Sequence, residues 1–175
     1  VLAISVPYRV QRLVAYVDPW SDPYGNGFQL VQSLIAFGRG EWFGVGLGNS
    51  VQKLFYLPEA HTDFVFAIWA EESGAIGALL VMLLYAGLVA RIIWIGWQSS
   101  LVGNLFGANF CNGVAVLIAG QAVINIGVTM GLLPTKGMTL PFISWGGTSL
   151  LVSVLMLSLV LRIEQDLKFQ RKSVE

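Results

Sequence analysis

The sequence predicts an all-α fold, a polytopic bundle of transmembrane helices with a large outer loop. Hydrophobic residues make up 55% of the 175-residue chain and charged residues only 11%, whereas soluble domains carry about 25% charged residues. The mean hydropathy is +0.71. Three segments are also long and apolar enough to cross a bilayer as helices, which takes about 20 residues. We therefore expect a single integral membrane domain over residues 1–175.

The first part of the chain is dominated by the outer loop. Residues 1–6 are apolar but too short to span a membrane, and we expect them to be the end of a transmembrane helix whose beginning lies outside this sequence. Residues 7–62 are too long for a simple connector. Within this loop, residues 28–37 have apolar side chains at helical spacing opposite Gln29, Gln32 and Ser33. This pattern predicts a short amphipathic helix, either lying on the membrane surface or packed on its own loop.

Three transmembrane helices are predicted after the loop, over residues 64–94, 108–133 and 141–163. The remaining segments are a polar link at 98–107, a short turn at 133–140 and a charged tail at 164–175.

Basic residues near the helix ends predict the orientation of these helices. The C-terminal tail holds a dense group of them: Arg162, Lys168, Arg171 and Lys172. Cytoplasmic segments are enriched in Lys and Arg, so we expect the C-terminus in the cytoplasm. The long loop then faces the outer side of the membrane, and the chain crosses the membrane several times.

Charge and composition exclude several classes of function. The formal net charge is zero, so no basic field indicates binding to nucleic acid. One cysteine and one histidine cannot build a zinc site at any usual spacing, and Cys111 is expected to pack as a small apolar residue. The run Gly44-Val45-Gly46-Leu47-Gly48 lacks the strand–turn–helix context of a nucleotide-binding motif, so we interpret its glycines as turn residues.

Asp63 is the first candidate for chemistry, because it lies where a polar loop enters the first predicted span. One interpretation is a helix N-cap, a position that favours Asp. The other is a general base or acid at the outer membrane surface, where burial would shift its pKa into a useful range. Both interpretations can hold together.

Further charged residues lie near Asp63 or follow it in the first span. Glu71 comes about two helical turns later, and we expect it either to line an inner cavity or to pair with Arg9, Arg12 or Lys136. His61 and Glu59 could tune or position Asp63, although a lone loop histidine is more often structural. Lys53 and Lys136 are natural partners for a phosphate group, or else ordinary loop lysines.

Polar and small residues within the later spans are interpreted first as packing residues. Gln121 and Asn125 lie one helical turn apart and could join neighbouring helices by hydrogen bonds. The pair Gly146-Gly147 in the stretch beginning at Ser144 could loosen the last helix and shape a cavity beneath the turn near Lys136.

Several long motifs, in the same order along the chain, resemble the SEDS proteins (the FtsW, RodA and SpoVE family). They are Asp18-Pro19-Trp20, Gly27-Phe28-Gln29-Leu30, Ile35-Ala36-Phe37-Gly38-Arg39-Gly40, Gly44-Val45-Gly46-Leu47-Gly48-Asn49-Ser50, Leu57-Pro58-Glu59-Ala60-His61-Thr62-Asp63-Phe64, Leu133-Pro134-Thr135-Lys136-Gly137 and Leu140-Pro141-Phe142-Ile143-Ser144-Trp145-Gly146-Gly147. The forms around Lys53 and Lys136 are those of the FtsW branch of the family rather than the RodA branch.

The resemblance implies the C-terminal part of a ten-helix SEDS fold, without its first helices. It implies a multi-pass protein of the bacterial inner membrane whose large loop lies in the periplasm. It also implies a peptidoglycan glycosyltransferase activity, the polymerisation of lipid II into peptidoglycan glycan strands, at the division septum during cell division. It also implies a class B penicillin-binding protein of the FtsI type as partner, together with other divisome proteins.

The family's catalytic aspartate corresponds to Asp63, which would act as general base on the acceptor sugar. Lys53, Arg39 and Lys136 are the candidate cations for the pyrophosphate leaving group, with a divalent cation (Mg²⁺ or Mn²⁺) as a candidate cofactor. Glu59, His61 and Glu71 complete the predicted substrate-binding set. Two alternatives stay open, namely a lipid II flippase and a scaffold that only recruits the transpeptidase.

Overall fold

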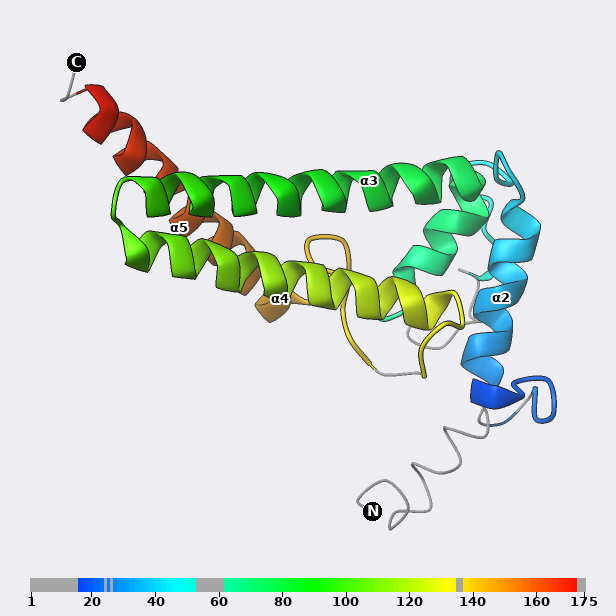
Figure 1. Cartoon of the computed structure of the whole chain (residues 1–175). Helices are drawn as coiled ribbons and strands as arrows, with labels where there is room; N and C mark the ends of the chain where they lie inside the picture. Colours follow the sequence, from blue (N-terminus) through cyan, green and yellow to red (C-terminus); the bar gives the residue numbers. More distant parts are fainter. Residues whose placement is uncertain (1–15, 24, 26, 53–61, 135–136, 173–175) are drawn as a thin grey trace, which may run out of the picture.

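The computed structural model describes residues 16–23, 25, 27–52, 62–134 and 137–172. Its named elements are the helices α2 (Phe28–Gly40), α3 (Val65–Leu101), α4 (Leu105–Thr129) and α5 (Gly147–Lys172) (Figure 1). No strand occurs in these described ranges, and the predicted all-α class is confirmed.

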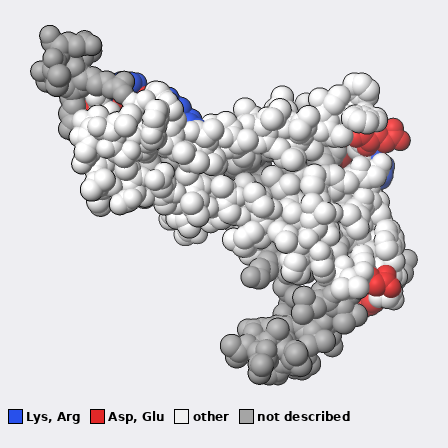
Figure 2. Space-filling view, viewed as in Figure 1, with Lys and Arg blue, Asp and Glu red and all other residues white. Residues whose placement is uncertain are grey.

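Three of these helices are long and apolar enough to cross a membrane, namely α3, α4 and the Gly147–Phe169 part of α5. The helices α3 and α4 run antiparallel and pack along their length (Figure 1). Their shared core contains Ile92, Ile95 and Ile118 around Cys111, which is fully buried as expected. On the face shown in Figure 2 the charged side chains gather toward the ends of the molecule, and the middle carries none.

The helix ends differ from the predicted ones because local polar contacts override apolar composition. α3 continues through the predicted polar link to Leu101, and α4 already begins at Leu105. Asn104 caps α4, since its side chain accepts a hydrogen bond of 2.9 Å from the Gly107 N–H. At the other end, α4 stops at Thr129 instead of residue 133.

The last helix begins later and ends later than predicted. Residues 141–146 form turns instead of helix, because the Ser144 hydroxyl accepts from the Leu140 N–H at 2.7 Å and Phe142 has a positive φ of 67°. The expected charged tail continues α5 to Lys172. Two i,i+4 ion pairs support this extension: Arg162–Asp166 at 3.2 Å and Lys168–Glu164 at 2.9 Å.

The main departure from the predicted spans is a break in α3 at Gly74, where φ is 70° and ψ is −170°. A short piece, residues 65–73, leaves the long piece at a steep angle and runs back past α4 (Figure 1). A candidate span is present where residues 64–94 predict one, but it is interrupted at Gly74. The apolar length of the segment could not show that Gly74 adopts a conformation that other residues avoid.

Residues 41–46, which we call the splint loop, bridge this break with backbone hydrogen bonds. The Val45 and Gly46 N–H groups donate to the carbonyls of Glu71 (3.0 Å) and Glu72 (3.1 Å). On the far side of the break, the Ala75 and Ile76 N–H groups donate to the carbonyls of Glu41 (2.8 Å) and Trp42 (3.3 Å). Backbone groups freed by the break are thus paired, which a membrane environment requires.

Helix α2 packs on α3 and α4 rather than on its own loop. Its buried residues are Leu30, Val31, Ser33, Ala36 and Gly40. The helix expected over residues 28–37 is therefore present, but Ser33 belongs to its buried face. There the Ser33 hydroxyl donates to the Thr129 carbonyl at 2.6 Å, so a serine counted as solvent-facing joins α2 to the end of α4.

Candidate functional site

Asp63 lies half-buried immediately before α3. Phe64 occupies the N-cap position of that helix, so the helix-cap interpretation placed the cap one residue too early. The short piece of α3 therefore presents Asp63 at its N-terminal end, where the positive end of the helix dipole stabilises a carboxylate.

Two side chains from other elements hold the backbone around Asp63. Asn125 of α4 donates through Nδ2 to the Asp63 carbonyl (2.8 Å) and to the Met138 carbonyl (2.5 Å). The Ser144 hydroxyl donates to the Thr62 carbonyl. We call Asn125 and Ser144 the carbonyl clamp. It fixes the start of α3 against α4 and against the turn that precedes α5.

Gly137 leaves room for the carboxylate of Asp63. A Cβ atom built at Gly137 would lie only 2.8 Å from Asp63 Oδ2, which is closer than real Cβ contacts. The glycine of the predicted Lys136-Gly137 turn therefore lies against the candidate catalytic group.

A cavity of about 640 Å³ opens beside the clamp. Val65, the first residue of α3, lines one side, and residues 142–147 with Leu150 line the rest. Gly146 and Gly147 belong to this lining, although none of the described residues of the turn near Lys136 lines the same cavity. Because Val65 and Ser144 both line it, the cavity lies next to the backbone that carries Asp63.

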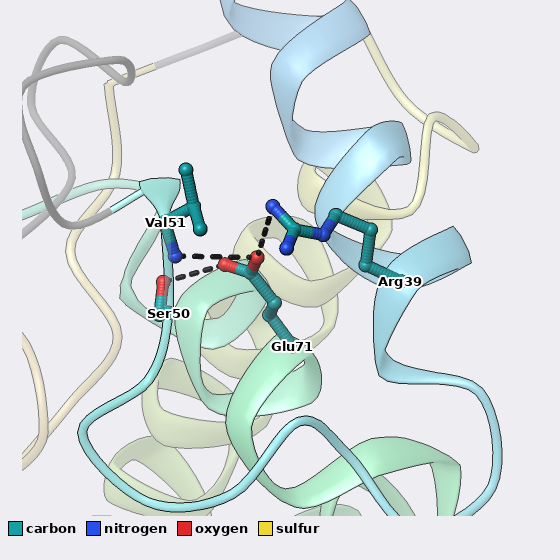
Figure 3. Close-up of polar contacts among 4 residues, drawn as sticks. All are labelled: Arg39, Ser50, Val51 and Glu71. Carbon is teal, nitrogen blue, oxygen red and sulfur yellow. Dashed lines mark hydrogen bonds and ion pairs between the residues drawn. The ribbon is translucent and has the colours of Figure 1, made fainter.

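Glu71 ties the outer loop and α2 to the short piece of α3 (Figure 3). Its carboxylate is fully buried and lies 3.5 Å from Arg39 Nη1. It also accepts hydrogen bonds from the Ser50 hydroxyl (2.5 Å) and the Val51 N–H (3.4 Å). A structural ion pair was among the expectations for Glu71, and the structure gives Arg39 as the partner.

The other predicted site residues lie outside the described residues: Lys53, Glu59, His61, Lys136, Arg9 and Arg12. The described segments on either side of residues 53–61 are both anchored. Glu71 holds Ser50 and Val51, and the carbonyl clamp holds Thr62 and Asp63.

Sequence reasoning treated Asn125 and Ser144 as packing residues and did not connect them with Asp63. The available signal was polarity, because a buried amide in a transmembrane helix is costly unless it is hydrogen-bonded. No three His, Cys, Asp or Glu side chains come together as metal ligands in the described part of the chain.

Comparison with known proteins decides the family. The sequence profile of the FtsW, RodA and SpoVE family, described as cell cycle protein, matches residues 1–169. The chain belongs to this family. Three helices able to span a membrane, together with this membership, make it a multi-pass membrane protein.

Among members of the family, the chain is 60% identical to a protein of Hahella chejuensis over 94% of its own length and 42% of that relative. It is 58% identical to a protein of Coxiella burnetii, covering 94% of the chain and 44% of the relative. Both relatives are described as probable peptidoglycan glycosyltransferase FtsW. The chain thus spans less than half of the length of these relatives.

A solved structure also matches. It concerns a peptidoglycan synthase complex in which polymerization and crosslinking are coordinated, and it aligns with a TM-score of 0.68 at 34% identity. The match covers 93% of this chain and 43% of the solved one. The FtsW-like members and this fold neighbour agree with the predicted identification as part of the SEDS fold.

Proposed function

We propose that this chain carries the catalytic aspartate of a peptidoglycan glycosyltransferase that polymerises lipid II during septal cell-wall synthesis. The observation that carries the proposal is the placement of Asp63. Its backbone is clamped by Asn125 and Ser144, and its carboxylate lies beside Gly137. A cavity lined by Val65 and Ser144 opens close to this backbone. The names of the FtsW-like relatives support the same activity.

In the proposed reaction Asp63 acts as general base. Its carboxylate takes the proton from the acceptor sugar hydroxyl, and that oxygen forms a bond to the anomeric carbon of the donor. The bond from this carbon to the pyrophosphate oxygen breaks, and undecaprenyl pyrophosphate leaves with the electron pair. Attack opposite to the leaving group inverts the anomeric centre and gives a β-1,4 link.

Cations must stabilise the charge on the departing pyrophosphate. We propose Arg39, Lys53 and Lys136 for this role, with Glu59 and His61 positioning Asp63 or the substrate. The Arg39 side chain is 44% exposed although it pairs with Glu71, which supports its availability to a ligand. A divalent cation, Mg²⁺ or Mn²⁺, bound at the pyrophosphate would supply further positive charge there.

Partners and location follow from the same proposal. A class B penicillin-binding protein of the FtsI type would crosslink the new strands at the division septum, within the divisome. The fold neighbour is described as a peptidoglycan synthase complex that coordinates polymerization and crosslinking, which supports a crosslinking partner for this chain.

A lipid II flippase is the alternative that a broken transmembrane helix most suggests, because transporters bind substrates at such breaks near the bilayer midplane. Here the splint loop pairs the backbone on both sides of the break in α3. The cavity of about 540 Å³ between α3 and α4 has an almost wholly apolar lining, so the described residues offer no polar path there. These two features favour polymerisation over transport.

The test uses a full-length chimera in which this sequence replaces the matching part of the Hahella chejuensis relative, reconstituted with its transpeptidase in proteoliposomes. Polymer formation and lipid translocation are measured for the wild type, Asp63→Ala and Asp63→Asn. We expect both variants to insert normally and to form no polymer. Polymerisation by Asp63→Ala contradicts the assignment. If the wild type translocates lipid II but forms no polymer, and the variants lose translocation, the flippase is favoured. If the wild type shows neither polymerisation nor translocation, the scaffold is favoured.

A further inference from the structure

The direction of a side chain is set by the two peptide planes that flank its Cα atom, since these planes determine φ and ψ. At Asp63 both planes are held. The plane before it contains the Thr62 carbonyl, which accepts from Ser144. The plane after it contains the Asp63 carbonyl, which accepts from Asn125 at 2.8 Å. Two hydrogen bonds from two different elements therefore fix the Cα–Cβ direction of one residue.

Asn125 is suited to this task by its burial and by the chemistry of its neighbours. The side chain is 2% exposed, and its Nδ2 group faces two carbonyl oxygens, those of Asp63 and Met138. Only the NH₂ end of an amide can donate to both, so the orientation of the side chain is determined. Its Oδ1 has no hydrogen-bond partner among the described residues, which shows that the described contacts depend on the donor end alone.

Ser144 is held just as firmly. Its oxygen accepts from the Leu140 N–H at 2.7 Å while its single hydrogen goes to the Thr62 carbonyl. The turn that carries it is closed by the Ser144 N–H donating to the Leu140 carbonyl at 3.0 Å. The Tyr85 hydroxyl of α3 donates to the Pro141 carbonyl and anchors the same turn.

We infer that Asn125 and Ser144 are positioning residues for the catalytic step. They act through the backbone of Asp63 and aim its carboxylate into the space that Gly137 leaves open. The inference rests on the proposed function, because it assumes that Asp63 reacts. Reactions that depend on a positioned base are sensitive to small displacements, and a shift of about 1 Å can lower the rate about 100-fold.

The test measures kcat and KM for lipid II with the full-length chimera and its transpeptidase, together with the unfolding temperature of each variant. Asn125→Leu removes both donated hydrogen bonds at similar volume, and Ser144→Ala removes one. We expect kcat to fall about 100-fold for Asn125→Leu and about 10-fold for Ser144→Ala, with KM changed less than about twofold. Ser144→Thr keeps the hydroxyl and should restore most of kcat.

The control for Asn125→Leu is Gln121→Leu, one turn earlier on α4, for which we expect a kcat near that of the wild type. The inference is overturned if Asn125→Leu and Ser144→Ala keep kcat within about threefold of the wild type, or if Gln121→Leu lowers kcat as much as Asn125→Leu. If Asn125→Leu does not fold, Ser144→Ala against Ser144→Thr decides alone. Activity in Asp63→Asn would instead contradict the proposed function, so the two failures are distinguishable.

Discussion

Replacing Gly44 by alanine should uncouple the splint loop from the break in α3. Gly44 has a positive φ of 78°, and a Cβ atom there would lie 2.1 Å from the Glu72 carbonyl oxygen. That oxygen belongs to the rigid backbone of the break, so the loop must move away from it. The movement stretches or breaks the hydrogen bonds from Val45 and Gly46 to the Glu71 and Glu72 carbonyls.

The magnitude follows from the separate contributions. A non-glycine residue in the left-handed region costs about 1 kcal/mol, and each lost backbone hydrogen bond costs about 1 kcal/mol. The free energy of unfolding of Gly44→Ala should therefore fall by about 3 kcal/mol. Gly48 provides a matched control because its φ is +83° but no atom lies within 4 Å of its Cβ position.

The assay is reversible unfolding of the purified protein in mixed detergent micelles, followed by circular dichroism. Gly48→Ala should lose only about 1 kcal/mol. Gly38 lies in α2 with no atom within 4 Å of its Cβ position, so Gly38→Ala should gain up to about 1 kcal/mol. If Gly44→Ala is no less stable than Gly48→Ala, the splint loop does not support the break and the reasoning is refuted.

Two further predictions concern the site itself. Gly137→Ala should displace the Asp63 carboxylate, because its Oδ2 would lie 2.8 Å from the new Cβ. We expect kcat for polymerisation to fall about 10-fold at an unchanged unfolding temperature, and an unchanged kcat would contradict the close approach. Glu71→Ala should lower the free energy of unfolding by about 2–4 kcal/mol, because the buried donors of Ser50 and Val51 lose their acceptor. Arg39→Ala should lower the free energy of unfolding by less than about 1 kcal/mol, since Arg39 is 44% exposed. Equal losses for Glu71→Ala and Arg39→Ala would show that the ion pair, rather than the hydrogen bonds to Glu71, contributes most of the stability.

The sequence was sufficient for the class of fold and for the region of the site. Apolar length identifies three spans because the bilayer imposes one length on every helix that crosses it. The motif ending in Asp63 identifies the candidate base. Asn104 could also have been found as the start of α4, since an Asn after Gly103 is a common helix start signal.

The remaining features depend on contacts between residues far apart in the chain. The Ser73-Gly74 pair is a local kink signal, but only the pairing with residues 41–46 shows that the helix breaks there. Likewise, Asn125 lies 62 positions from the Asp63 carbonyl that it binds. Periodicity cannot reveal such a partner, so both members of the carbonyl clamp were interpreted as packing residues.

The most direct test of the account is the rate of glycan strand formation by Asp63→Asn in the full-length chimera with its transpeptidase. Asparagine keeps the shape of the side chain and the clamped backbone but cannot accept the proton from the sugar hydroxyl. General base catalysis contributes about 100-fold to 10,000-fold, so kcat should fall by at least about 100-fold while the unfolding temperature stays unchanged. A kcat within about threefold of the wild type would contradict the central claim that Asp63 is the general base.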